Sequence, residues 1–161
     1  SYQEGKDQFD DITIVSLTFK SYLDKKNVRR EFVATVEAFA EVSEFIEETL
    51  MSYDVNLKYI NQMNIAVEEI FTNIAKYGFK GTGNGKATVD ITFVNGIVTV
   101  TTYDNSPKFD TFAAKEPDIT LAAEDRKIGG LGILMVRRLM DEVSYKYENG
   151  MNVISLIKKV F

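Results

Sequence analysis

The sequence predicts an α+β fold, a two-layer sandwich in which helices cover one face of a mixed, mostly antiparallel sheet. Two consecutive segments, residues 37–52 and 56–77, carry apolar side chains at helical spacing. Two pairs of β-branched runs turn at Asn95-Gly96 and at Asn149-Gly150, and Asn-Gly between such runs is a strong hairpin signal. Helices in one block and antiparallel hairpins elsewhere are typical of this fold class.

The first elements in chain order are expected to be strands. Residues 9–19 are rich in β-branched and apolar side chains, which favours a strand, and the polar residues 20–27 are interpreted as a linker. Residues 28–36 alternate between apolar and polar side chains and predict a half-exposed strand. The amphipathic helix over residues 37–52 follows.

The second helix has the clearest pattern. Its apolar residues fall at three- and four-residue steps on one face: Leu57, Ile60, Met63, Val67, Ile70, Phe71 and Ile74. Gly78 stands where a C-terminal cap is expected.

Strands are expected over residues 86–94 and 97–103, and again over residues 142–147 and 151–160. Between the two hairpins, residues 104–128 show no sustained period and contain both prolines. Connections of this length are usually functional lids or disordered segments. A short helix is expected over residues 133–140.

The composition excludes several kinds of chemistry. The 161 residues carry 19 basic and 24 acidic side chains, a formal charge of −5, which argues against a general nucleic-acid binder. Cysteine is absent, which excludes disulfides and cysteine nucleophiles, and so is histidine, the commonest general base and metal ligand. Catalysis would have to use carboxylates, lysines, hydroxyls, backbone amides or a bound cofactor.

The chain shows no targeting or membrane signal. No apolar run approaches the roughly 20 residues that span a bilayer, and the polar first residues do not resemble a signal peptide. A cytoplasmic location is therefore expected. Because the first residue is Ser1 rather than Met, the sequence is interpreted as a processed chain or a segment of a longer protein.

One flank of the second helix carries polar side chains that could act together. At 100° per residue this flank is formed by Gln62, Ala66, Glu69, Asn73 and Lys76. Glu69 and Asn73 can point at one ligand and hold a hard cation such as Mg²⁺, or a water, against a phosphate chain. Taken alone, an acidic helix flank that faces solvent is the commoner interpretation.

Two further motifs could bind a ligand. Asp104 ends a strand before the turn-forming Asn105-Ser106-Pro107, and its carboxylate could accept a hydrogen bond from the exocyclic amine of adenine; a simple turn is the alternative. Gly129-Gly130-Leu131-Gly132 opens a helix, where backbone N–H groups can approach phosphate oxygens. Arg126 and Lys127 could neutralise phosphate charge, while a flexible hinge is an equal competitor.

In this order, the three motifs resemble the ATP-binding family shared by DNA gyrase B, Hsp90, sensor histidine kinases and MutL, the GHKL or histidine-kinase-like ATPases. Residues 68–77 resemble its N box, residues 103–107 its adenine-binding Asp motif, and residues 129–132 its glycine-rich box. The branch that the chain resembles is that of the bacterial anti-sigma-factor serine kinases, through residues 130–153. The resemblance covers about residues 29–160.

The resemblance implies a Bergerat-type ATP site with ATP and Mg²⁺ as cofactors. Asn73 would hold the Mg²⁺, and Glu69, at the family's catalytic position, would take the proton from an attacking serine hydroxyl. Asp104 would bind the adenine amino group, Asn152 would lie near the base, and residues 107–128 would close over the phosphates as a lid. The other expected nucleotide contacts are Lys76, Ser106, Lys127, Gly129, Gly130, Leu131 and Gly132.

Two positions depart from the family pattern. Ser106 stands where glycine is usual, which bears on how closely its loop approaches the ligand. Lys76 replaces a common histidine and would add positive charge near the phosphates if it points inward.

The resemblance implies an ATP-dependent serine/threonine kinase domain of the anti-sigma-factor type. It would phosphorylate a serine on a STAS-domain anti-sigma-factor antagonist, in a partner-switching pathway that regulates transcription. A sigma factor would be a second partner, and such kinases commonly act as homodimers; direct contact with nucleic acid or membrane is not expected. The alternative is a non-catalytic nucleotide-binding module that acts by protein contact, for instance on a fused phosphatase.

The first residues carry a separate resemblance. Residues 8–17 (Gln-Phe-Asp-Asp-Ile-Thr-Ile-Val-Ser-Leu) resemble the last strand of bacterial PPM-type serine phosphatases, whose Asp-Asp-Ile-Thr supplies a metal-ligating aspartate. Residues 1–27 would then be the end of a preceding phosphatase domain with its linker, and residues 28–161 the ATPase domain. An ordinary edge strand is the alternative.

Overall fold

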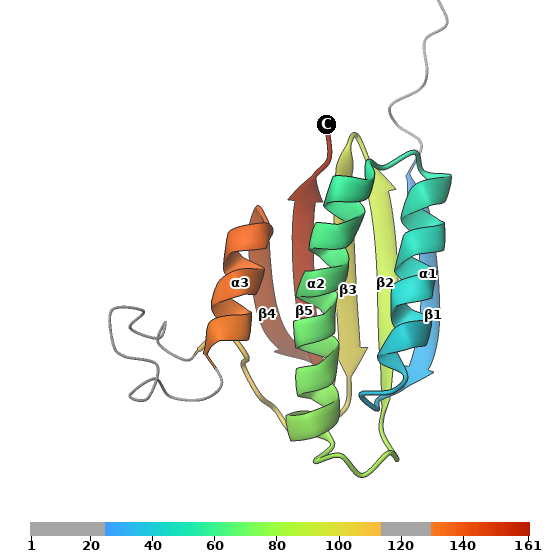
Figure 1. The fold of residues 1–161 in the computed structure, drawn as a ribbon. Helices are drawn as coiled ribbons and strands as arrows, with labels where there is room; N and C mark the ends of the chain where they lie inside the picture. The colour runs from blue at the N-terminus through green and yellow to red at the C-terminus, as the bar shows by residue number, and fades with distance from the viewer. Residues whose placement is uncertain (1–24, 114–129) are drawn as a thin grey trace, which may run out of the picture.

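A computed structural model describes residues 25–113 and 130–161, which form a sheet with helices on one of its faces (Figure 1). In chain order the elements are β1 (Lys26–Val33), α1 (Phe39–Ser52), α2 (Leu57–Asn73), the π-helical turn η1 (Ile74–Gly78), β2 (Lys86–Val94), β3 (Ile97–Asp104), α3 (Leu131–Leu139), β4 (Glu142–Glu148) and β5 (Met151–Lys159). Within the described residues, the predicted order of strands and helices is confirmed, and so is the two-layer α+β class.

The described strands form one five-stranded sheet in the order β1-β2-β3-β5-β4, and every pair is antiparallel. The described part of the sheet thus has no parallel pair, although a mixed sheet was expected. The reason is that β5 lies between β3 and β4. Both predicted hairpins are confirmed. Asn95, Gly96, Asn149 and Gly150 have φ angles of 52°, 72°, 53° and 74°, which asparagine and glycine tolerate best.

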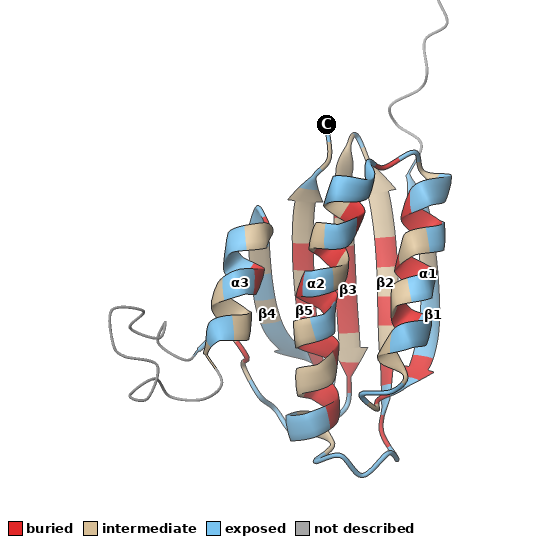
Figure 2. Ribbon diagram, viewed as in Figure 1, coloured by how far each residue is buried: buried red, intermediate tan, exposed pale blue. Residues whose placement is uncertain are grey.

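The core lies between the sheet and the helices. Figure 2 shows the buried residues of α1 and α2 on the sides that face the sheet. The stripe predicted on α2 is buried at Ile60, Met63, Val67, Ile70 and Phe71, each at most 1% exposed, but its first member was predicted wrongly: Leu57, at the start of the helix, is 57% exposed. Each of the buried side chains stabilises the fold by about 1.5–3 kcal/mol relative to exposure, so this stripe fixes the rotation of α2 about its own axis.

Several element ends differ from the sequence-based prediction, among them the start of β1 at Lys26, inside the predicted linker, and the start of α1 at Phe39, two residues later than expected. β1 ends at Val33 rather than at residue 36, because the chain turns there and the Thr35 N–H donates to the Val33 carbonyl at 2.9 Å. The α-helical part of α2 ends at Asn73, and the expected last turn is π-helical, with the Phe79 N–H donating to the Ile74 carbonyl at 3.0 Å. α3 begins at residue 131, two residues earlier than expected.

Two predictions fall wholly or partly on residues that the structure does not describe. The strand expected over residues 9–19 lies outside the described ranges, as do residues 114–128 of the expected lid. Within the described ranges, no helix combines the length and the apolar character that crossing a membrane requires.

Two leucines test the assignment of the core. Leu50 of α1 is 1% exposed and Leu57 of α2 is 57% exposed. We expect Leu50→Ala to lower the free energy of unfolding by about 2–5 kcal/mol, because the lost methyl groups leave a cavity. Leu57→Ala, the matched surface control, should change it by about 0.5 kcal/mol or less. Chemical denaturation followed by circular dichroism measures both, and equal losses would contradict the core described above.

Candidate functional site

Helix α2 carries Glu69 and Asn73 on the flank beside its buried stripe, and both side chains are half-buried. Side chains four residues apart on a helix have Cβ atoms about 5–6 Å apart. The two groups therefore lie next to each other along one edge of α2. Lys76, predicted to share this flank, is exposed on η1.

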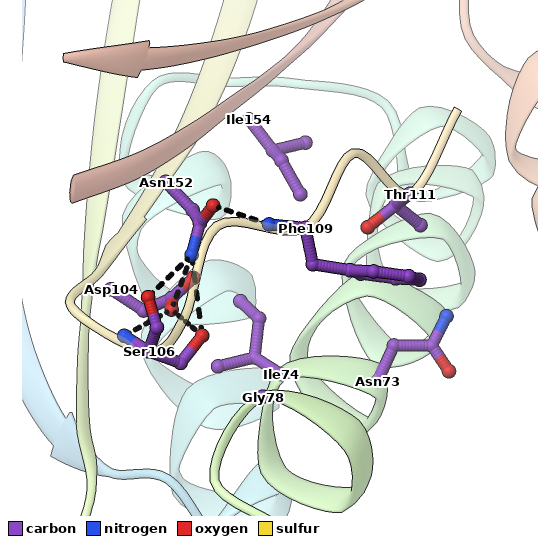
Figure 3. Close-up of a pocket in the computed structure, with 9 residues that line it drawn as sticks. All are labelled: Asn73, Ile74, Gly78, Asp104, Ser106, Phe109, Thr111, Asn152 and Ile154. Carbon is purple, nitrogen blue, oxygen red and sulfur yellow. Dashed lines mark hydrogen bonds between the residues drawn. The ribbon is translucent and has the colours of Figure 1, made fainter. Parts of the chain in front are cut away.

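A buried polar cluster lies where the end of β3 meets the start of β5. Asp104 and Asn152 are register partners, and with Ser106 they are only 2%, 3% and 4% exposed. The Asn152 amide donates to Asp104 Oδ1 at 3.1 Å and to the Ser106 carbonyl at 3.1 Å (Figure 3). The Ser106 N–H donates to the same Oδ1 at 3.0 Å, and the Ser106 hydroxyl donates to it as well. These donors compensate for the removal of the Asp104 carboxylate from water.

The direction of the Asn152 side chain is fixed from its other end. Asn152 Oδ1 accepts the Phe109 N–H at 3.1 Å and the Tyr145 hydroxyl at 2.9 Å. With the oxygen held by two donors, the amide NH₂ has to face Asp104. Burial raises the pKa of Tyr145, and the Asp110 and Asp104 carboxylates raise it further, so the hydroxyl keeps the proton that it donates.

Ser106 fits into this cluster because a glycine faces it. A Cβ on Gly78 would lie 2.6 Å from Ser106 Oγ and 3.0 Å from Ser106 Cβ. The end of η1 and the turn after β3 are therefore in direct contact. The serine at the position where the family resemblance led us to expect glycine is accommodated by a glycine on the opposite element.

A small pocket, here called the base pocket, lies beside the cluster. Its lining residues are Asn73, Ile74, Gly78, Asp104, Ser106, Phe109, Thr111, Asn152 and Ile154 (Figure 3). One buried carboxylate and one carboxamide beside two isoleucines suit a flat ring that bears an amino group. The polar groups of the pocket therefore suit adenine. The volume of the pocket, however, is about 10 Å³, the space of a single water molecule, so the adenine ring enters only after a lining side chain moves.

A second hollow, here called the glycine hollow, lies between α2 and the start of α3. Its lining residues are Glu69, Leu131, Gly132, Leu134, Met135 and Arg138. A Cβ on Gly132 would overlap the Glu69 carboxylate, so the absence of a side chain lets α3 approach α2 here. The N-cap of α3 is Gly130, which has no side chain to satisfy the first N–H groups of the helix. A helix start of this kind favours an anionic ligand.

The site residues predicted from the sequence lie around these two neighbouring hollows rather than around one shared cavity. The base pocket has Asn73, Asp104, Ser106 and Asn152 in its lining. The glycine hollow has Glu69, Leu131 and Gly132. Lys76 lines neither of them. The predicted contacts Lys127 and Gly129, with Arg126, lie outside the described residues.

Sequence reasoning missed several residues of the site, among them Phe109, Tyr145 and Gly78. Phe109 lines the base pocket, whereas the sequence placed it only within the expected lid of residues 107–128, over the phosphates. Tyr145 looked like an ordinary member of an alternating strand, yet it holds Asn152. Gly78 was interpreted as a helix cap, but it is the last residue of η1, whose C-cap is Phe79, and its missing side chain makes room for Ser106.

The described residues contain no group of three or more Asp, Glu, His or Cys side chains that could hold a metal ion. A cation at this site would rely on the Asn73 amide oxygen, which is a hard ligand of the type that Mg²⁺ accepts. The remaining ligands would be waters and oxygens of a bound phosphate chain, as is usual for Mg²⁺.

Comparison with known proteins gives three findings. A family model described as the histidine kinase-like ATPase domain matches residues 32–158. The chain is 35% identical over 99 residues to the serine-protein kinase RsbW of Listeria monocytogenes serovar 1/2a, and 28% identical over 99 residues to that of Bacillus subtilis strain 168. These alignments cover 59% and 58% of this chain, and 63% and 61% of the relatives, so the chain spans less than two thirds of their length.

The third finding concerns the fold. The crystal structure of the RsbU and RsbW domains of Rv1364c from Mycobacterium tuberculosis matches with a TM-score of 0.60 at 17% sequence identity. The match covers 84% of this chain and 32% of that chain. It shows that the two-layer arrangement occurs in that protein.

The contact between Gly78 and Ser106 can be tested by a double-mutant cycle. We expect Gly78→Ala to lower the free energy of unfolding by about 1–3 kcal/mol, because the new methyl group meets the Ser106 side chain. In a Ser106→Gly background the same substitution should cost at least about 1 kcal/mol less. Denaturant unfolding of the four proteins measures the coupling, and additive effects would show that the two residues do not touch.

Proposed function

The chain belongs to the histidine kinase-like ATPase domain family, and on that premise we propose that it is an ATP-dependent serine/threonine kinase domain of the anti-sigma-factor type. One spatial relation carries the proposal. Asn73 borders the base pocket, and Glu69, one turn earlier on α2, borders the glycine hollow. A nucleotide with its base in the first and its phosphates at the second would have its reactive end beside a carboxylate.

The base is recognised by the buried polar cluster in this proposal. Asp104 accepts a hydrogen bond from the exocyclic amine of adenine, while Asn152 and Ser106 hold the carboxylate in place through its Oδ1. Ile74 and Ile154 supply the apolar walls of the pocket. Guanine carries a carbonyl oxygen where adenine carries the amine, and a carboxylate would repel it.

The phosphates are held at the start of α3. Gly130, Leu131 and Gly132 present backbone N–H groups of the first helical turn, which is a favourable position for negative charge. Gly129, the preceding residue in the sequence, is proposed as a further contact. Lys76 and Lys127 are proposed to add positive charge as the phosphates bind.

The Asn73 amide oxygen also suits a magnesium ion, for which Asn73 would be the protein ligand. The bound ion would supply charge neutralisation along the phosphate chain. Glu69 lies one turn from Asn73 on the same flank of α2.

Glu69 is the proposed general base. Its carboxylate takes the proton of a serine hydroxyl as the serine oxygen forms a bond to the γ-phosphorus and the bond from that phosphorus to the β-phosphate oxygen breaks. The products are a phosphoserine, ADP and a protonated Glu69, which later returns its proton to water. A carboxylate suffices as base, so a chain without histidine can support this reaction.

The proposed protein substrate is a STAS-domain anti-sigma-factor antagonist, with a sigma factor as the second partner in a switching cycle. The relatives named serine-protein kinase RsbW support a serine acceptor. We further propose that the kinase domain begins with β1, two residues before the predicted boundary at residue 28 because Lys26 and Asn27 pair with β2, that the residues before β1 end a preceding phosphatase domain, and that the kinase domain acts as a homodimer.

One observation favours a second candidate, a nucleotide-binding module without catalysis. The Ser106 hydroxyl, at the position where glycine was expected, donates to the Asp104 carboxylate and so competes with a base for it. Such a module would act on its partner by contact alone. Tight nucleotide binding without phosphoryl transfer would distinguish it from the kinase.

Neighbouring glutamates of α2 test the role of Glu69. We expect Glu69→Gln to reduce phosphoryl transfer from labelled ATP to the cognate STAS protein by ~10²–10⁴-fold, because glutamine cannot accept the proton. Nucleotide affinity, measured by calorimetry, should stay within about threefold, since Gln keeps the shape of Glu.

Glu68→Gln is the matched control, because Glu68 is exposed and lines neither hollow. Its transfer rate should equal that of the unmodified chain. A Glu69→Gln protein that transfers phosphate as fast as the control would remove Glu69 from the mechanism.

A further inference from the structure

A short segment after β3, residues 107–112, crosses the base pocket and is fastened on two sides. We call it the strap. On one side the Phe109 N–H donates to Asn152 Oδ1 of β5 at 3.1 Å. On the other side the Arg137 guanidinium of α3 donates to the Phe112 carbonyl at 3.0 Å and lies 5.2 Å from the centre of the Phe112 ring. Within the strap, the Phe112 N–H donates to Asp110 Oδ1 at 2.9 Å.

Phe109 is the lining residue of the base pocket that can most easily move. It is 54% exposed, whereas Asp104, Asn152 and Ile154 are at most 3% exposed and belong to the strands of the sheet. Figure 3 shows the Phe109 ring carried by the strap, on the side of the pocket where Asn73 and Thr111 also lie. Displacing a half-exposed ring gives up far less buried apolar surface than displacing a core strand.

The size of the pocket makes such a movement necessary. The base pocket holds about 10 Å³, which is the space of one water, while small-molecule sites usually measure ~300–1,000 Å³. A purine ring therefore does not fit into the base pocket in this conformation. The strand-borne walls cannot retreat without breaking the core, so the strap has to give way.

We propose that Phe109 is a removable cover of the base pocket, held in place by Asn152 and, through Phe112, by Arg137. This inference rests on the proposed nucleotide site and adds to it a residue that controls entry. When the strap lifts, the Phe109 N–H leaves Asn152 and the ring leaves the side of the pocket where Asn73 lies. Arg137 belongs to α3, whose first turn is the proposed phosphate site. The same helix therefore holds the strap over the base pocket and binds the phosphate end of the nucleotide.

The cover has a thermodynamic consequence. The apparent affinity for a ligand is reduced by the fraction of molecules in which the site is open. Removing the ring should raise that fraction, and so should loosening its fastening. A ring that instead stacked on the bound base would have the opposite effect, since its loss would weaken binding.

The experiment compares the association of a fluorescent ADP analogue, labelled on the ribose, with the full chain and its variants in the presence of Mg²⁺. We expect Phe109→Ala to raise the association rate constant by about tenfold and to lower the dissociation constant in proportion. Phe161→Ala is the matched control, because Phe161 is 83% exposed and lines neither hollow. Its rate should equal that of the unmodified chain.

A second variant tests the fastening. Arg137→Ala should raise the association rate in the same direction by about threefold, because the strap keeps its bond to Asn152. The control is Arg30→Ala, which removes a comparable guanidinium that lies 4.6 Å from the ring centre of Phe45 and belongs to β1, at the edge of the sheet opposite β4. It should leave the rate unchanged.

The outcomes separate this inference from the function on which it rests. Binding that is unchanged or weaker in Phe109→Ala would overturn the cover while leaving the nucleotide site intact. Equal rates for Arg137→Ala and the unmodified chain would overturn the role of α3 in holding the strap. Absence of binding by the unmodified chain and by Phe109→Ala alike would overturn both the cover and the nucleotide site.

Discussion

The packing of α2 against the sheet is the constraint on which the rest of the structure depends. Its apolar stripe is buried almost completely, so the helix cannot rotate without exposing the core. This fixes the direction of the neighbouring flank, where Asn73 reaches the base pocket and Glu69 reaches Gly132. The distance between the two hollows is therefore set by one turn of a helix rather than by flexible loops, which is how a rigid element positions functional groups.

The buried cluster at the end of β3 adds a second fixed point. A carboxylate with 2% exposure would destabilise the fold if donors did not surround it. Donors reach it from its own turn, through Ser106, and from β5, through Asn152, and Asn152 is in turn held by Tyr145 of β4. Because each member depends on the next, the cluster keeps one acceptor group pointing at a defined place beside the pocket. A site built in this way selects ligands by the direction of their hydrogen bonds.

Local patterns accounted for most of the fold and for part of the site. The hairpins at Asn95-Gly96 and Asn149-Gly150, and the stripe of α2, depend on residues that are neighbours in sequence, so their patterns were sufficient. The π-helical turn η1 lies where Gly78 contacts Ser106, and the early start of α3 lies where Gly132 contacts Glu69. Both contacts join residues that are distant in sequence. The spacing of apolar residues along the sequence does not indicate such pairs. The same holds for Phe109, whose position over the pocket follows from a bond to a residue 43 positions away.

In the proposed function, one nucleotide spans the two hollows along α2. The most direct measurement is a crystal structure of this chain with Mg²⁺ and a non-hydrolysable ATP analogue. We expect the adenine amino group within hydrogen-bonding distance of the Asp104 carboxylate and the terminal phosphate between Glu69 and the first turn of α3. Density for the analogue on the bare face of the sheet, or a base that does not contact Asp104, would contradict the proposed function.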